Sequence, residues 1–233
     1  DLVQRAGVKH QAYYSATGID PPEVVKFINE HYPYVIHKRP NHKGTRSFYG
    51  MLVQKQPPTI FVRWCCSILK KDPTKGIPLP HRIMGLRAEE SSARAKRKKY
   101  EYMKALKQWV YKPIFDWLEW EIWEYIDSSH LPYPDLYDEG FSRIGCVICP
   151  FICGKNQKQL DLHKSRWPKH YAAFEKAMKK HWDLKAQCSQ GEKSYSQSFD
   201  DFLKNWYRGN KDMERVNRNR SGKNWYHGNR SAK

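Results

Sequence analysis

The sequence predicts an α/β protein with a three-layer α/β/α architecture, in which helices cover both faces of a parallel sheet, followed by a helical C-terminal extension. Short apolar or aromatic segments alternate with amphipathic ones in the first half of the chain, and such alternation is typical of parallel sheets. After residue 153 the pattern is helical only. We therefore expect a main domain over residues 1–155, a helical extension over 156–207 and a basic, flexible tail over 208–233.

Four short segments are expected to be strands or extended stretches, namely residues 10–15, 34–37, 83–86 and 112–115. The third of them, Ile-Met-Gly-Leu, is apolar throughout, which predicts a buried strand. Arg87 follows that strand directly. Because ligands bind beyond the carboxyl ends of the strands in parallel sheets, we expect Arg87 to lie at a binding site.

Apolar periodicity and capping residues predict the helices. They are expected at residues 1–7 (the end of one), 21–31, from 48 onward, 88–109 and 117–126. Asp20 and Asp116 are the expected N-caps of the second and the last of these. A further helix is expected to open at Pro168 in the extension.

The composition excludes several classes of protein. No apolar run approaches the roughly 20 residues that cross a bilayer, and the N-terminal residues do not form a signal peptide. Six cysteines in a lysine-rich chain of 233 residues are too sparse for a secreted disulfide scaffold. The formal net charge of +18 attracts polyanions such as nucleic acid or nucleotides. We expect a cytoplasmic protein with no membrane partner.

The cysteines form the most informative pattern. Cys65 and Cys66 are adjacent, and Cys146 and Cys149 form a Cys-x-x-Cys motif. Four thiolates can hold a [4Fe–4S] cluster or a structural zinc. Adjacent side chains diverge, so the pair suits the separate iron corners of a cubane better than one tetrahedral zinc. Two alternatives stay open: Cys153 could replace one of the pair, and all of the thiols could be bare.

Four stretches together resemble the phosphoadenosine phosphosulfate (PAPS) reductase family. They occur in the family's order and cover about residues 10–152. They are Thr-Gly-Ile-Asp-Pro-Pro-Glu at 17–23, Arg-Trp-Cys-Cys-Ser-Ile-Leu-Lys at 63–70, the Gly-x-Arg-x-x-x-Ser-x-x-Arg loop at 85–94, and Leu-Tyr-x-x-Gly-x-x-Arg-x-Gly-Cys at 136–146. Any one of them alone would be weak, but the set is specific.

This resemblance implies an adenine nucleotide alpha-hydrolase-like fold of the PP-loop superfamily. It implies a [4Fe–4S] cluster on Cys65, Cys66, Cys146 and Cys149, and an ATP or other adenylyl nucleotide as ligand. The implied site residues are Lys70 and Arg87 for catalysis, and Thr17, Gly18, Glu23, Arg87, Ser91 and Arg94 for the nucleotide. Arg87 and Arg94 also offer bidentate donors to phosphate or sulfate, and Lys70 offers a point charge beside the thiolates.

Two departures from the family's pattern direct the expected function. The chain lacks the Ser-Gly-Gly-Lys-Asp-Ser phosphate loop, which we expect just upstream. It also lacks the terminal Glu-Cys-Gly-x-His nucleophile, and Cys188, the only late cysteine, is expected to be incidental. The chain is therefore more similar to the DNA-phosphorothioation branch, which implies ATP pyrophosphatase-type activation of nucleic acid for sulfur transfer. The alternatives are a PAPS or adenylyl-sulfate reductase and a zinc-containing, non-enzymatic nucleic-acid-binding module.

The basic surplus supports a nucleic-acid partner, either DNA or tRNA, and a sulfur-donor protein is a further possible partner. The expected contacts are Lys96, Arg97, Lys98 and Lys99 to phosphates, and Trp206 and Trp225 to bases. Both tryptophans lie in a small repeat, Asn-Trp-Tyr-x-Gly-Asn, at 205–210 and 224–229.

Overall fold

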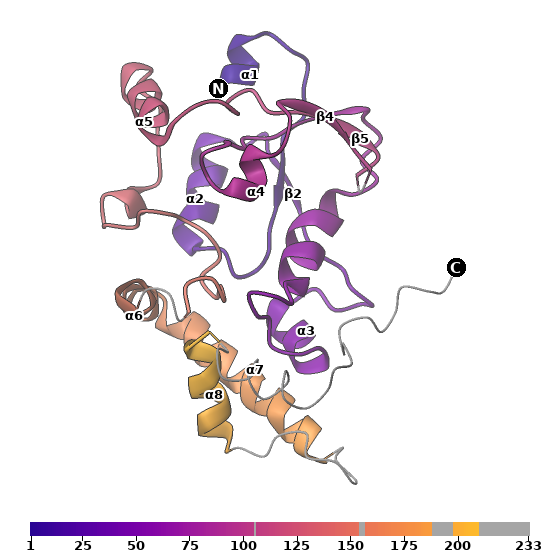
Figure 1. Cartoon of the computed structure of the whole chain (residues 1–233), viewed down its shortest axis with the longest axis vertical. Coiled ribbons are helices and arrows are strands. Elements are labelled where there is room, and N and C mark those ends of the chain that lie inside the picture. The colour runs from indigo at the N-terminus through magenta and orange to yellow at the C-terminus, as the bar shows by residue number, and fades with distance from the viewer. Residues whose placement is uncertain (105, 154–156, 188–197, 210–233) are drawn as a thin grey trace. The chain divides into compact units, whose positions relative to one another are not determined.

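The structure, a computed structural model, describes residues 1–104, 106–153, 157–187 and 198–209 (Figure 1). Two compact units share the chain, and each is described by itself. Unit 1 is made of Asp1–Ser15, Pro22–Lys38 and Lys71–Ile144, and unit 2 of Ala16–Pro21, Arg39–Lys70 and the described residues from Gly145 onward. The boundaries of the three parts expected from the sequence stay a prediction.

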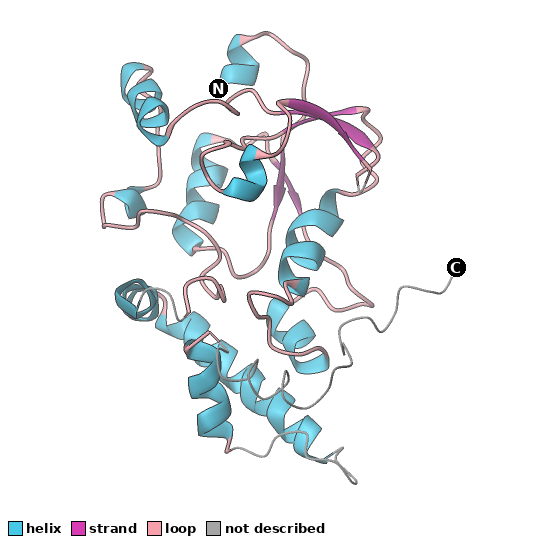
Figure 2. Ribbon diagram, in the orientation of Figure 1, coloured by secondary structure: helices cyan, strands magenta, loops and turns pink. Residues whose placement is uncertain are grey.

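The strands of unit 1 form two small sheets (Figure 2). In one, β1 (Tyr13–Ser15) pairs in parallel with β2 (Ile36–Lys38). In the other, β5 (Gln108–Tyr111) lies between β3 (His81–Ile83), to which it is parallel, and β4 (Tyr100–Met103), to which it is antiparallel. The predicted α/β class with parallel strand pairing is confirmed.

Helices are the other regular elements of the described structure. Unit 1 contains α1 (Leu2–Arg5), α2 (Pro22–His31), α4 (Ser92–Ala95), α5 (Glu119–Ser128) and the 3-10 turns η2 (Asp72–Thr74) and η3 (Asp135–Tyr137). Unit 2 contains α3 (Phe48–Gln54), α6 (Gln157–Arg166), α7 (Pro168–Gln187) and α8 (Phe199–Tyr207), and the π-helix η1 (Cys66–Lys71) begins in it. No helix in the described part of the chain is long and apolar enough to cross a membrane.

The prediction of one long helix over residues 88–109 is wrong. Helix α4 ends at Ala95, and β4 and β5 follow it as a hairpin. Its basic middle suggested a solvated helix face, but Tyr100, Tyr102, Trp109 and Tyr111 alternate with other residues at the strand period of two. Aromatic residues favour strands, and here tertiary pairing outweighs the helix propensity of the lysines and arginines.

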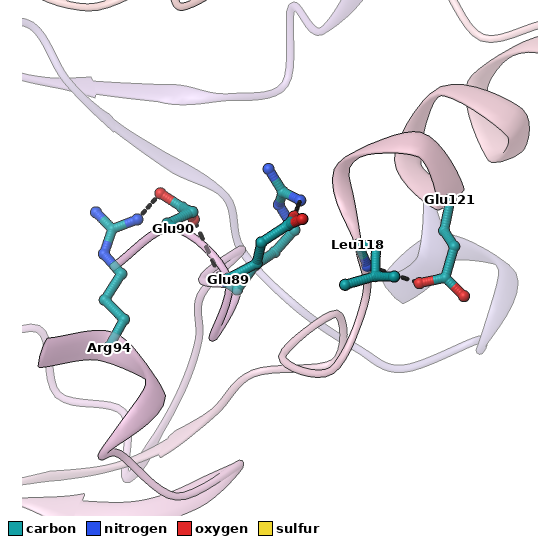
Figure 3. Close-up of polar contacts among 6 residues, drawn as sticks. Glu89, Glu90, Arg94, Leu118 and Glu121 are labelled. Atoms are coloured by element: carbon teal, nitrogen blue, oxygen red, sulfur yellow. Dashed lines mark hydrogen bonds and ion pairs between the residues drawn. The ribbon is translucent and has the colours of Figure 1, made fainter. Parts of the chain in front are cut away.

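Two smaller expectations are also wrong. The strand near Arg87 is β3, two residues earlier than predicted, and its Ile83 is 42% exposed rather than buried. Asp116 does not cap α5, because its carboxylate accepts a hydrogen bond from Lys99 Nζ at 2.9 Å. The N-cap is Leu118, whose backbone N–H donates to the Glu121 carboxylate at 2.6 Å (Figure 3).

A buried ion pair fastens the β4–β5 hairpin. Lys112 Nζ is fully buried and donates to the Lys98 carbonyl at 2.6 Å and to Glu101 Oε1 at 2.8 Å. The hydrogen bond from Lys112, followed by that from Arg97, holds the pKa of Glu101 below its usual value. The hairpin therefore depends on a charged Glu101 carboxylate.

Glu101→Gln is expected to lower the free energy of unfolding by about 1–3 kcal/mol at pH 7. This is less than the roughly 3–5 kcal/mol of a fully buried pair, because the Glu101 side chain is 23% exposed. Since the folded-state pKa is lowered, this stability is present above the ordinary carboxyl pKa and is lost as the pH falls through the lowered one. Urea unfolding at several pH values measures it. The exposed Glu124→Gln is the control, and an equal loss in both variants would contradict the pairing.

The core of unit 2 is aromatic. Phe174 on α7 is fully buried and packs against Phe48 on α3 and Trp206 on α8, with ring centroids 6.5 and 4.5 Å away. Met178, one turn further along α7, is also fully buried. His181 Nδ1 lies 3.0 Å from the Val53 carbonyl oxygen, which ties the end of α7 to α3.

Candidate functional site

The adjacent cysteines of unit 2 lie at the start of η1. This π-helical turn is anchored by Ile68 and Leu69, both of which are buried. Such turns are rare in proteins, and those that do occur are often found at functional sites. A hydrogen bond with the Cys66 side chain, burial and the nearby Cys146 raise the pKa of Cys65 far above its usual value. Cys65 is thus a neutral thiol at neutral pH unless a metal deprotonates it.

Lys70, at the other end of the same turn, lies against Cys146. Burial alone would lower the pKa of Lys70, but the charge of Cys146, a hydrogen bond with its side chain, and Asp20 together raise it. Burial raises the pKa of Cys146 to about 11 despite the lysine. The predicted neighbourhood of Lys70 and a cysteine is therefore present, and the ammonium group is positioned to compensate negative sulfur.

The Cys-x-x-Cys loop is held through the backbone of Val147. Its N–H donates to the Ile19 carbonyl at 2.8 Å. Its carbonyl accepts from the Tyr171 hydroxyl at 3.1 Å and lies 3.4 Å from His163 Nδ1. Burial lowers the pKa of His163, which favours the neutral ring. Helices α6 and α7 therefore position the loop, a contribution that the sequence did not predict.

The segment that Val147 contacts is the expected nucleotide loop at 17–20. Thr17 is buried, its N–H donates to the Asp20 carboxylate at 2.8 Å, and its hydroxyl accepts from the Ile19 N–H at 3.2 Å. Gly18 sits at φ 77°, a left-handed conformation that favours glycine. Thr17 and Gly18 thus lie in the same unit as the cysteines and form a closed turn.

Cys153 differs from the other cysteines. It is buried, and its Sγ donates to the Cys149 carbonyl at 3.7 Å. Burial, followed by the charge of Cys149, raises its pKa to about 12. These contacts satisfy Cys153 as a neutral thiol.

The cysteines share one neighbourhood but do not meet at a point. Cys65 interacts electrostatically with Cys66 and Cys146, and Cys146 with Cys149. Over the four described ranges, no three His, Cys, Asp or Glu side chains converge on a position for a single metal ion.

Unit 1 carries a group of three arginines, Arg87, Arg94 and Arg143. Burial and then the charges of Arg143 and Arg87 lower the pKa of Arg94, so the Arg94 guanidinium group is repelled by both of the other arginines. Carboxylates offset this repulsion (Figure 3). Arg87 donates to Glu89 at 2.6 Å, and Arg94 pairs with Glu90. Arg143 stands in the motif at 136–146, but sequence reasoning gave it no role.

The remaining predicted site residues have mixed outcomes. Ser91 is the N-cap of α4, and its hydroxyl accepts from the Arg94 N–H at 3.2 Å. Glu23 lies in the first turn of α2 in unit 1. The exposed side chains at 96–99 follow α4 instead of lining a helix face.

The predicted stacking role of Trp206 is wrong. Its side chain is 2% exposed and its Nε1–H donates to the Pro58 carbonyl at 2.8 Å, so no ring face is open to a base. Trp225, the other predicted stacking residue, lies outside the described residues.

Comparisons with known proteins show the family to which this chain belongs. The family model described as the phosphoadenosine phosphosulfate reductase domain matches residues 1–151. The chain therefore belongs to this family, whose named members are enzymes of sulfur metabolism.

Adenosine 5'-phosphosulfate reductase of Neisseria meningitidis serogroup B is 34% identical over 129 residues, which cover 54% of this chain and 48% of that protein. The enzyme of the same name from Allochromatium vinosum is 26% identical over 182 residues, or 72% of this chain and 67% of that one. The crystal structure of PAPS reductase from Candida auris in a phosphate complex has 18% identity and a TM-score of 0.44, covering 57% of this chain and 68% of that one. The chain spans about half the length of the Neisseria relative.

Proposed function

We propose that the chain is part of a sulfonucleotide reductase, which binds adenylyl sulfate or its 3'-phosphorylated form and reduces the sulfate to sulfite. The single observation that carries this proposal is Lys70 held against Cys146, among three further cysteines and beside the loop at 17–20. The names of the relatives favour this function over sulfur transfer to nucleic acid. In the overall reaction a thiol reductant supplies two electrons and is oxidised to a disulfide. Sulfite is released together with AMP from adenylyl sulfate, or with adenosine 3',5'-bisphosphate from the 3'-phosphorylated form.

The cysteine centre suits a [4Fe–4S] cluster on Cys65, Cys66, Cys146 and Cys149. Four thiols in one neighbourhood are the usual donor set, and a cubane binds each of them at a separate iron. One zinc ion would need its donors at a common point. When bound, the cluster would supply a redox-active, electrostatically tunable centre. Lys70 would compensate the negative charge of the thiolates.

The three arginines suit the anionic part of a nucleotide. Guanidinium groups bind phosphate or sulfate through paired hydrogen bonds. Glu89 and Glu90 occupy the donors of Arg87 and Arg94. An incoming phosphate or sulfate would take the place of these carboxylates.

Removing one arginine tests this part of the proposal. Arg143→Gln is expected to weaken binding of adenylyl sulfate by about 10- to 100-fold, the effect of losing one charge-assisted hydrogen bond. Isothermal titration of the anaerobically purified full chain measures it, with Arg5→Gln, another partly exposed arginine of unit 1, as the control. Equal affinity in the two variants would contradict the site. Sulfite release on addition of a thiol reductant tests the reaction itself.

A second candidate function is nucleotide-dependent sulfur transfer to nucleic acid. The net charge of +18 favours it, because a reductase of small nucleotides does not need such a surplus. In that case ATP would be converted to AMP and pyrophosphate, with turnover dependent on DNA or tRNA and sulfur coming from a donor protein. Turnover of ATP without adenylyl-sulfate reduction separates this function from the first.

A further inference from the structure

One face of the three-stranded sheet in unit 1 carries large side chains that point to solvent. Along β5, Gln108 and Val110 are buried, whereas Trp109 and Tyr111 are each 42% exposed. The register places Tyr100 opposite Tyr111 and Tyr102 opposite Trp109, all on that face. The set, called the aromatic platform below, consists of His81, Ile83, Tyr100, Tyr102, Trp109 and Tyr111.

The rings of the aromatic platform form a continuous row across the three strands. Tyr100 stacks on Trp109 with centroids 4.8 Å apart and planes 13° apart, and His81 lies 6.5 Å from Tyr100 at 16°. Tyr102 meets Trp109 edge-on at 5.5 Å. These contacts hold the rings in fixed orientations. A contiguous exposed apolar face of this kind marks a binding surface in a chain whose mean hydropathy is −0.88.

The residues next to the aromatic platform are basic. Lys96 and Lys98 precede β4, and Lys104 and Lys107 lie in the turn between β4 and β5, all of them exposed. Glu101 lies on the opposite face of the sheet, where it pairs with Lys112. The charge of this surface therefore complements a polyanion.

We propose that the aromatic platform binds single-stranded nucleic acid, with unpaired bases stacked on Tyr102 and Trp109 and phosphates along the lysines of the β4–β5 turn. Aromatic rings on a sheet beside basic residues are a general means of holding single strands, because every base has a π face. Paired bases of a duplex offer no such face. The proposal stands apart from the reductase assignment.

Fluorescence anisotropy of a labelled oligothymidine with the full chain tests the stacking. Trp109→Ala and Tyr102→Ala are each expected to weaken binding about 10-fold, the usual effect of losing one base–aromatic stack. Trp120→Ala is the matched control, because Trp120 is 60% exposed on α5 and lies outside the platform. A duplex of the same length is expected to bind more weakly than the single strand.

A second variant does not disturb the packing of the sheet. The double substitution Lys104→Gln, Lys107→Gln is expected to reduce the slope of log affinity against log salt by about one to two. Circular dichroism checks that each variant is folded. Three results would overturn the proposal. The first is that folded Trp109→Ala binds the oligonucleotide as tightly as the unchanged protein does, and the second is that duplex and single strand bind with equal affinity. The third is that the protein is a dimer which Trp109→Ala converts to a monomer while the affinity for the oligonucleotide stays the same.

Discussion

Replacing Cys146 by serine is expected to remove most of the iron and sulfide from anaerobically purified protein. Cys146 is the cysteine with the most connections to the centre, since it interacts with Cys65, Cys149 and Lys70. A hydroxyl is a poor substitute for a thiolate in a cluster. The substitution would also remove the sulfur partner of the Lys70 ammonium group.

Cys153→Ser is the matched control for that experiment. Its thiol is buried and already donates to the Cys149 carbonyl, so we propose that it is not a ligand. Iron and sulfide analysis and the visible absorption spectrum are compared in both variants. Two outcomes would show that the proposed ligand set is wrong. One is that Cys146→Ser retains its iron, and the other is that Cys153→Ser loses its iron while Cys146→Ser keeps it.

Phe174→Ala is expected to lower the free energy of unfolding of unit 2 by about 3–5 kcal/mol. The ring is fully buried between Phe48 and Trp206, so the substitution leaves a cavity that three different helices line. The neighbouring helix residue Tyr171 holds the Val147 carbonyl, and the cysteine loop should therefore loosen as well. Urea unfolding followed by tryptophan fluorescence measures the loss.

Phe61→Ala is the control in the same unit, because Phe61 is 61% exposed. It is expected to change the free energy of unfolding by less than about 0.5 kcal/mol. Comparable losses in both variants would mean that Phe174 does not occupy a rigid core. A loss below about 1 kcal/mol for Phe174→Ala would lead to the same conclusion.

Local sequence signals, such as a proline in the first turn of a helix, correctly predicted those elements for which tertiary packing favours the same structure. Pro22 and Pro168 open helices where the first turn has no need of a proline N–H, and α2 and α7 begin there. The stretch 88–109 was misjudged because its lysines and arginines have good helix propensity, whereas the aromatic residues take part in strand pairing. Strand pairing depends on a distant partner, which periodicity within one segment does not reveal.

The residue types of the candidate site could be predicted from the sequence, but the contacts that position these residues could not. Cysteine spacing and the neighbouring Lys70 indicated a shared centre, and Lys70 does contact Cys146. Arg143 was missed as a site residue because it is distant in sequence from Arg94, whose pKa its charge lowers. Trp206 resembled a stacking residue in a basic segment, but the amphipathic α8 turns its ring into the core.

Metal and sulfide analysis of the anaerobically purified full chain tests the central claim most directly. Iron, acid-labile sulfide and zinc are quantified on one sample, together with its visible spectrum. We predict a brown protein with about four iron and about four sulfide per chain and little zinc, as a [4Fe–4S] cluster requires. A colourless protein with one stoichiometric zinc, or with neither metal, would contradict it.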